Sequence, residues 1–156
     1  WLVTAIIIGQ ILLGGLVASH YAALVCTDFP TCHGKWIPTL SGIVGLHVLH
    51  RLGAYFTTAC VFALYLIVRR MGPVGASLRT LTGWMSIVVS LQILIGIANV
   101  LFYTPPLITV LHQAVGVALF GLSLTASFVG RSAFAQSPVK SLSLTLGAPE
   151  VVRNRP

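Results

Sequence analysis

The sequence predicts an all-α membrane protein, a bundle of four transmembrane helices made of two repeated helix pairs. Three observations support this fold class. Hydrophobic residues make up 56% of the 156-residue chain and charged residues only 7%, too few to solvate a soluble domain of this size. Four apolar runs reach the roughly 20 residues that a helix needs to cross a bilayer. The third and fourth of these runs repeat motifs of the first and second.

The elements follow in order along the chain. The predicted spans are Trp1 to Ser19, Leu46 to Val68, Leu81 to Tyr103 and Leu107 to Val129. Helices are expected because backbone polar groups in lipid must pair within their own segment. Residues 1–130 form the transmembrane domain, with an outer loop at 20–45, and the polar residues 131–156 form a mobile cytoplasmic tail.

The distribution of basic residues predicts the orientation. They lie in the link between the second and third spans and after the fourth span: Arg69, Arg70, Arg79, Arg131, Lys140, Arg153 and Arg155. The positive-inside bias places both segments, and therefore both termini, in the cytoplasm. The net charge of +7 is thus explained by membrane orientation, and no nucleic-acid partner is expected. The expected location is a prokaryotic plasma membrane, with lipid as the surrounding partner.

Two short alignments carry the internal repeat. They pair GQILLGGLVAS (9–19) with LQILIGIANVL (91–101), and VLHRLGA (48–54) with VLHQAVG (110–116). The second alignment matches His50 with His112. Each histidine is expected about five residues inside the outer end of its helix, which places both within roughly 10 Å of the outer boundary at 1.5 Å per residue. Two imidazoles at one depth can face each other across a bundle.

Ionisable side chains in a membrane helix are costly and usually turn inward. His47, His50 and Arg51 share one helical face because they are three and four residues apart. We expect His50 and His112 to ligate a haem iron, with Arg51 near the haem propionates. The alternative is that both histidines only form hydrogen bonds between helices. His47 could support a ligand, replace one, donate a proton or be structural.

The first and third spans carry amides and small residues at helical spacing. Gln10 and Gly14 lie on the first span, and Gln92, Gly96 and Asn99 lie on the third. Small residues permit close helix approach, and amides can form hydrogen bonds across helices. These faces are therefore expected to point into the bundle.

The outer loop contains the segment LVCTDFPTCHGKW. Its cysteines, Cys26 and Cys32, face an oxidising compartment and are expected to form a disulfide. The alternatives are a redox-active pair or a metal site completed by His20 or His33. Asp28 is one of only two acidic residues in the chain. This scarcity excludes hydrolases, transferases and proton-coupled carriers that depend on an intramembrane carboxylate.

At these motifs the chain resembles the haem A synthase family, membrane proteins that convert haem O to haem A for cytochrome oxidase. The resemblance covers residues 9–130 and rests on GGLVASHYA, CTDFPTCHGKW, HVLHRLGAY and VLHQAVG in this order. Members typically have eight helices in two similar halves, each with two haem-ligating histidines and a cysteine-bearing outer loop. One half carries the reaction and the other holds haem b. The resemblance implies that His50 and His112 are the paired ligands, and that Cys26 and Cys32 are the loop cysteines.

One position departs from the family pattern. The reacting half places a glutamate three residues before its first histidine, and this chain has His47 there. The resemblance therefore implies a haem A synthase or, more closely, its haem b-holding half, with haem O as the possible substrate. Its partner would be a missing N-terminal half or a second copy in a homodimer, together with an electron donor that the sequence does not name. The alternatives are a membrane b-type cytochrome that leaves haem unoxidised and a haem-free assembly scaffold.

Overall fold

The computed structural model describes residues 1–36, 38, 40–71 and 75–135. Four long helices and one 3₁₀ turn occupy this part of the chain: α1 (Leu2–Ser19), η1 (Ala22–Leu24), α2 (Gly42–Arg69), α3 (Ala76–Leu101) and α4 (Pro106–Ala135). All four long helices are long and apolar enough to cross a membrane. The only β-type pairing within the described residues is an isolated bridge between Cys32 and Lys35. The predicted all-α, four-span fold class is confirmed.

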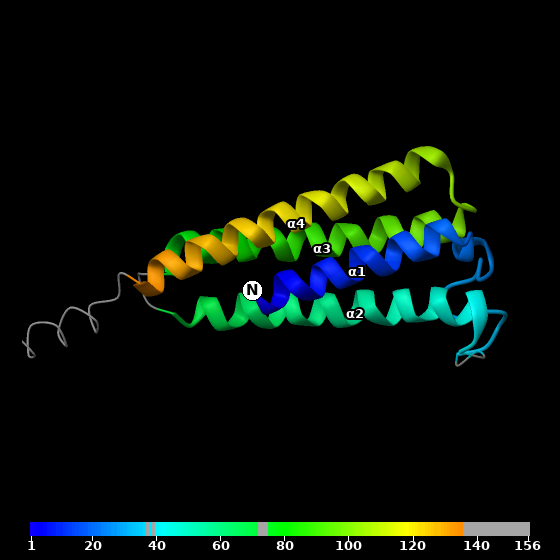
Figure 1. Cartoon of the computed structure of the whole chain (residues 1–156), viewed down its shortest axis with the longest axis horizontal. Coiled ribbons are helices and arrows are strands. Elements are labelled where there is room, and N and C mark those ends of the chain that lie inside the picture. Colours follow the sequence, from blue (N-terminus) through cyan, green and yellow to red (C-terminus); the bar gives the residue numbers. More distant parts are fainter. Residues whose placement is uncertain (37, 39, 72–74, 136–156) are drawn as a thin grey trace, which may run out of the picture.

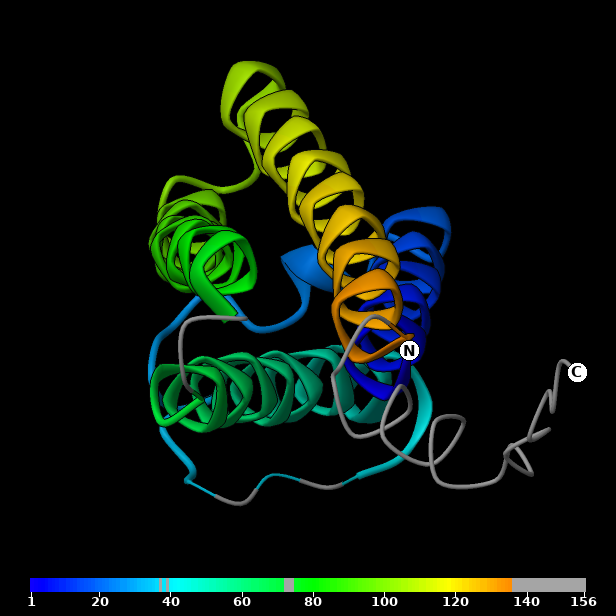
Figure 2. The same ribbon diagram turned by 90° about the vertical axis from the view of Figure 1, so that its left-hand side faces the viewer.

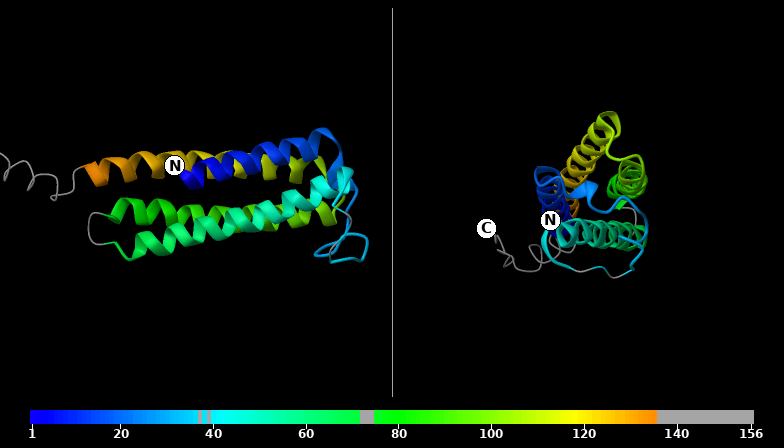
Figure 3. Two further views of the ribbon diagram at one scale, coloured as in Figure 1. Left: turned by 60° about the horizontal axis from the view of Figure 1, so that its bottom comes forward. Right: turned by 90° about the vertical axis from the view of Figure 1, so that its right-hand side faces the viewer.

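Successive helices run in opposite directions along an elongated bundle (Figure 1). The α1–α2 loop and the α3–α4 turn lie at one end, and the end of α2 and the start of α3 lie at the other. Each helix packs mainly against two neighbours, in the order α1, α2, α3, α4 around the bundle (Figures 2 and 3). The two helices that carry His50 and His112, α2 and α4, are therefore diagonal partners.

Several helix ends extend beyond the predicted apolar runs, whereas α1 ends at Ser19 as predicted and α3 ends at Leu101, two residues before the predicted Tyr103. α2 begins at Gly42 and α3 at Ala76, ahead of the predicted starts at Leu46 and Leu81. α4 continues past Val129 to Ala135, and residues 136–156 of the predicted tail lie outside the described part. Hydropathy marks only the apolar portion of a span, whereas helical hydrogen bonds continue into the polar flanks.

An apolar cluster fills one half of the bundle. Its buried members are Ile7, Val61, Val68, Leu78, Met85, Val89, Leu119 and Ala126. Val68 and Leu78 place it toward the α2–α3 end, away from the outer loop. Leu12, Phe56 and Leu94 remain exposed on the outside of the bundle, where apolar side chains suit contact with lipid tails. The other half of the bundle holds the polar residues singled out by the sequence.

Candidate functional site

His50 on α2 lies directly against α1. The side-chain amide Nε2 of Gln10 donates to the backbone carbonyl of His50 at 2.9 Å and to its ring Nδ1 at 3.1 Å. One turn further along α1, a Cβ built on Gly14 would lie 3.0 Å from the ring Cε1. The ring therefore occupies space next to the α1 backbone that a side chain at position 14 would take.

His112 on α4 has the same setting against α3. Nε2 of Gln92 donates to the backbone carbonyl of His112 at 3.0 Å and lies 3.3 Å from the ring Nε2. A Cβ on Gly96 would again lie 3.0 Å from the ring Cε1. The two helix pairs thus repeat a set of contacts as well as a sequence pattern.

The two settings differ in which ring nitrogen meets the amide. Gln10 holds Nδ1 of His50, and the Nε2 of that ring makes no hydrogen bond with the described residues. Gln92 holds Nε2 of His112, and both His112 Nδ1 and Gln92 Oε1 are buried without a partner among the described residues. Each ring therefore keeps one nitrogen that is not committed within the described protein.

Both histidines lie in the outer-loop half of the bundle. His50 follows the start of α2 at Gly42 by about 12 Å along the helix, and His112 follows Pro106 by about 9 Å, at 1.5 Å per residue. His50 lies further from its helix start than the expected five residues because α2 begins at Gly42 and not at Leu46. A neutral imidazole ligates haem iron through the ring nitrogen that carries no proton, so each ring would coordinate through its uncommitted nitrogen once the ring proton lies on the nitrogen beside the amide. The chemistry of this donor pair therefore fits a haem.

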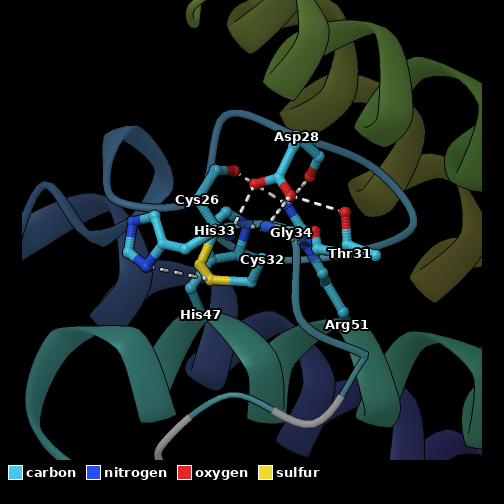
Figure 4. Close-up of a disulfide and its surroundings, with 8 residues drawn as sticks. All are labelled: Cys26, Asp28, Thr31, Cys32, His33, Gly34, His47 and Arg51. Carbon is cyan, nitrogen blue, oxygen red and sulfur yellow. Dashed lines mark hydrogen bonds between the residues drawn. A yellow bond between two sulfur atoms is a disulfide. The ribbon is translucent and has the colours of Figure 1, made fainter.

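Arg51 ties α2 to the outer loop (Figure 4). Its Nη2 donates to the carbonyls of Cys26 at 2.8 Å and Asp28 at 3.0 Å, and its Nη1 donates to the carbonyl of Thr31 at 2.9 Å. Its Nε donates to Nε2 of His47 at 3.2 Å. Four of the five N–H groups of a guanidinium are thus used, which leaves one on Nη1.

His47 is buried, with 2% of its surface exposed. Because its Nε2 accepts from Arg51, the ring proton is on Nδ1, which has no hydrogen-bond partner within the described residues. The structure thus brings His47 together with Arg51 and the loop.

The predicted disulfide is present in the outer loop. Cys26 and Cys32 are bonded, with their Cα atoms 5.0 Å apart, and both are buried. Their sulfurs are therefore not arranged as metal ligands. Among the described residues, no group of three or more His, Cys, Asp or Glu side chains is placed to hold a metal ion by itself. His20 and His33, the other ligands considered for this loop, are exposed.

Asp28 organises the turn inside the disulfide loop. Its carboxylate accepts hydrogen bonds from the Thr31 hydroxyl, from the His33 amide at 2.9 Å and from the Gly34 amide at 3.0 Å. The Thr31 hydroxyl and the Gly34 amide hold the pKa of this carboxyl well below its usual range. Asp28 and Pro30 predict turn chemistry between the two cysteines, and the structure shows the Asp28 carboxylate holding this turn. The threonine three residues later was the available signal for a side-chain-stabilised turn.

Comparison with known proteins gives a consistent match. The family model described as cytochrome oxidase assembly protein (COX15-CtaA) matches residues 1–124. A protein named heme A synthase from Shewanella oneidensis is 33% identical over 142 residues, covering 76% of this chain and 42% of the relative. A protein named heme A synthase from Paracoccus denitrificans is 33% identical and covers 75% of this chain and 33% of the relative. Another, from Symbiobacterium thermophilum, is 32% identical and covers 70% of this chain and 36% of the relative.

The chain therefore spans less than half the length of these curated relatives. No solved structure matches it. The four apolar helices and the bacterial relatives together identify an integral, multi-pass protein of the prokaryotic plasma membrane.

Proposed function

Because the chain belongs to the cytochrome oxidase assembly protein family, we propose that it forms the haem b-holding four-helix half of a haem A synthase. The observation that carries the proposal is the repeated setting of His50 and His112. Each histidine lies against a glycine and a glutamine of the preceding helix, and the two histidines come from diagonal helices.

In this proposal His50 and His112 would hold the haem iron. When bound, haem supplies a centre that can accept and release single electrons. The residues of the chain hold and orient this group and shield it from water. The apolar cluster fills the opposite half of the bundle, so the site lies in the outer-loop half.

Arg51 and His47 take supporting roles. The remaining Nη1 hydrogen of Arg51 can serve a haem propionate while its other donors hold the loop. His47 orients this guanidinium through Nε2, so it is assigned a positioning role and not that of a third ligand. No catalytic residue is assigned, because His47 stands where the family's reacting half has glutamate.

The oxidation of haem O to haem A is then a property of a larger assembly. The curated relatives are more than twice as long as the segments of this chain that match them. The other half would be a further four-helix segment or a second copy of this chain, and an electron donor would complete the system. The chain's own contribution is to hold haem b next to the reacting half.

Spectra of the purified chain in detergent, reconstituted with haem, test the ligand assignment. We expect the absorption of a haem with two histidine ligands. It should be lost in His50→Ala and in His112→Ala, and it should persist in His33→Ala, which removes an exposed loop histidine. Unchanged spectra in both ligand variants would contradict the assignment.

Extraction and mass spectrometry of the bound haem separate the rival functions. Haem b alone is expected for the holding half. Haem O with hydroxylated or formyl products would indicate that the chain itself carries the reaction. A membrane b-type cytochrome would be favoured if the chain holds haem b that a quinol reduces and if loss of the chain does not change haem A formation in cells. The absence of any haem would favour an assembly scaffold.

A further inference from the structure

We infer that Gln10 and Gln92 are positioning residues that set the orientation of the two ligand histidines. Each belongs to a Gln-x-x-x-Gly pair on the preceding helix, Gln10 with Gly14 and Gln92 with Gly96, which we call the Gln–Gly clamp. This inference rests on the proposed function, because it assigns the clamps to the haem ligands.

The first argument is the double hydrogen bond made by one amide nitrogen. Nε2 of Gln10 carries two hydrogens, and His50 accepts both, one at its backbone carbonyl and one at its ring. The amide therefore links the imidazole to the backbone of its own residue. In this state the two hydrogen bonds together restrain rotation of the side chain, so the ring is oriented before a ligand binds.

The second argument is that glycines close the clamp from both helices. Because Gly14 and Gly96 have no side chain, the edge of each histidine ring can lie close to the backbone of the preceding helix. On the helices that carry the histidines, a Cβ at Gly53 would overlap Oε1 of Gln10, and a Cβ at Gly116 would lie 3.2 Å from Nε2 of Gln92. Each amide is thus confined between a histidine and a glycine of the facing helix.

The third argument is the chemistry of a neutral amide. A metal-bound imidazole usually donates its other ring N–H to an acceptor, and this bond fixes the ring and raises its basicity. Here each amide nitrogen donates to its ring. When the ring binds a metal through its other nitrogen, its proton would move to the nitrogen beside the amide, and the amide would turn to accept that proton through Oε1. Oε1 of Gln92 is buried without a partner among the described residues, so an acceptor is available beside His112.

The test replaces each glutamine by methionine, which preserves length but removes both hydrogen-bonding groups. In the haem-loaded chain, Gln10→Met and Gln92→Met should each speed haem dissociation by about 10- to 100-fold, the usual effect of removing a partner of a metal ligand. The reduction potential of the haem should rise because the imidazole becomes less basic. Gln113→Met is the matched control, because Gln113 is adjacent to His112 but exposed.

Glutamate variants provide a second, opposite readout. In Gln10→Glu and Gln92→Glu, the carboxylate is a stronger acceptor and should lower the reduction potential below that of the unmodified chain. Circular dichroism of each variant establishes that the helices are retained. If a methionine variant does not fold, the glutamate variant at that position decides: a lowered potential supports the inference and an unchanged one overturns it.

The outcomes separate the two proposals. If the unmodified chain shows no haem with two histidine ligands, the proposed function fails and the positioning role fails with it. If the unmodified chain binds haem in this way but the folded methionine variants keep its dissociation rate and potential, only the positioning role is overturned.

Discussion

Two adjacent glycines in α1 have different surroundings. A Cβ on Gly14 would lie 3.0 Å from Cε1 of His50, whereas a Cβ on Gly15 would meet nothing within 4 Å. The sequence repeat already singled out the first of them, because Gly14 aligns with Gly96 and Gly15 aligns with Ile97. The geometry explains the difference, since only position 14 faces the ring of His50.

This pair offers a controlled substitution. Both Gly→Ala changes raise helix propensity by up to about 1 kcal/mol. We expect Gly15→Ala to keep haem and to melt at or slightly above the original temperature. Gly14→Ala should displace the ring of His50. At a fixed low haem concentration, the variant should then retain about tenfold less haem, which is the lower end of the effect of mutating a group that supports a metal ligand. The haem-to-protein ratio after gel filtration measures this, and equal ratios in the two variants would contradict the role of Gly14.

At the scale of the elements, Arg51 is the α2 side chain that forms hydrogen bonds with the outer loop among the described residues. Arg51 bonds three loop carbonyls, those of Cys26, Asp28 and Thr31. A partly buried carbonyl that loses its donor costs about 1–3 kcal/mol. The stability of the loop should therefore depend strongly on this residue.

Replacing Arg51 by glutamine should expose the disulfide. We expect a water-soluble reductant to cleave the Cys26–Cys32 bond about tenfold faster in Arg51→Gln, since about 1.4 kcal/mol corresponds to a factor of ten. Arg79→Gln is the control, because Arg79 is exposed and bonds only the Met71 carbonyl among the described residues. Quantifying free thiols over time measures the rate. A rate equal to that of the control would show that the loop is held without Arg51.

The depressed pKa of Asp28 makes the same loop sensitive to acid. A carboxyl whose folded pKa lies below its ordinary value of 3.8 stabilises the loop at pH values above 3.8. This contribution is lost as the pH falls through the folded pKa. Asp28→Asn should therefore be reduced faster than the unmodified chain by a phosphine at pH 6, and the ratio of the two rates should approach one as the pH drops below 3.8. A ratio independent of pH would show that the Asp28 carboxylate does not hold the turn.

The sequence predicts some features of these elements better than others. The four spans could be identified because a membrane helix must be apolar and must satisfy its own backbone. The paired positions of His50 and His112 followed from the repeat. The partners of Arg51 could not be predicted, because any residue supplies a backbone carbonyl and the loop reaches α2 only through the tertiary fold. The starts of α2 and α3 and the end of α4 were missed because hydropathy marks the apolar segment and not the hydrogen-bonded one.

At the scale of the whole molecule, the bundle is divided along its length. Apolar side chains of all four helices form the cluster near the α2–α3 end. The Gln–Gly clamps and the disulfide loop occupy the other half. Near the packed end, Thr4 on α1 donates to the Ser123 carbonyl on α4 at 3.2 Å, which joins the first helix to the last. The packed half can therefore maintain the bundle while the other half is adapted to a ligand.

This division predicts how the molecule lies in the membrane. The disulfide loop and the α3–α4 turn share one end, and Arg69, Arg70 and Arg79 lie at the other. The positive-inside bias assigns the arginine end to the cytoplasm. A disulfide at the outer face agrees with this assignment, because such bonds persist in oxidising compartments.

Cysteine labelling in intact cells tests the orientation. In a Cys60→Ala background, Trp36→Cys in the exposed outer loop should react with a membrane-impermeant maleimide added outside. Arg79→Cys, at the start of α3, should react only after the membrane is permeabilised. Both positions are exposed, so a difference in labelling reports the side of the membrane and not burial. The reverse pattern would place the candidate haem half toward the cytoplasm and would require electrons to enter from that side.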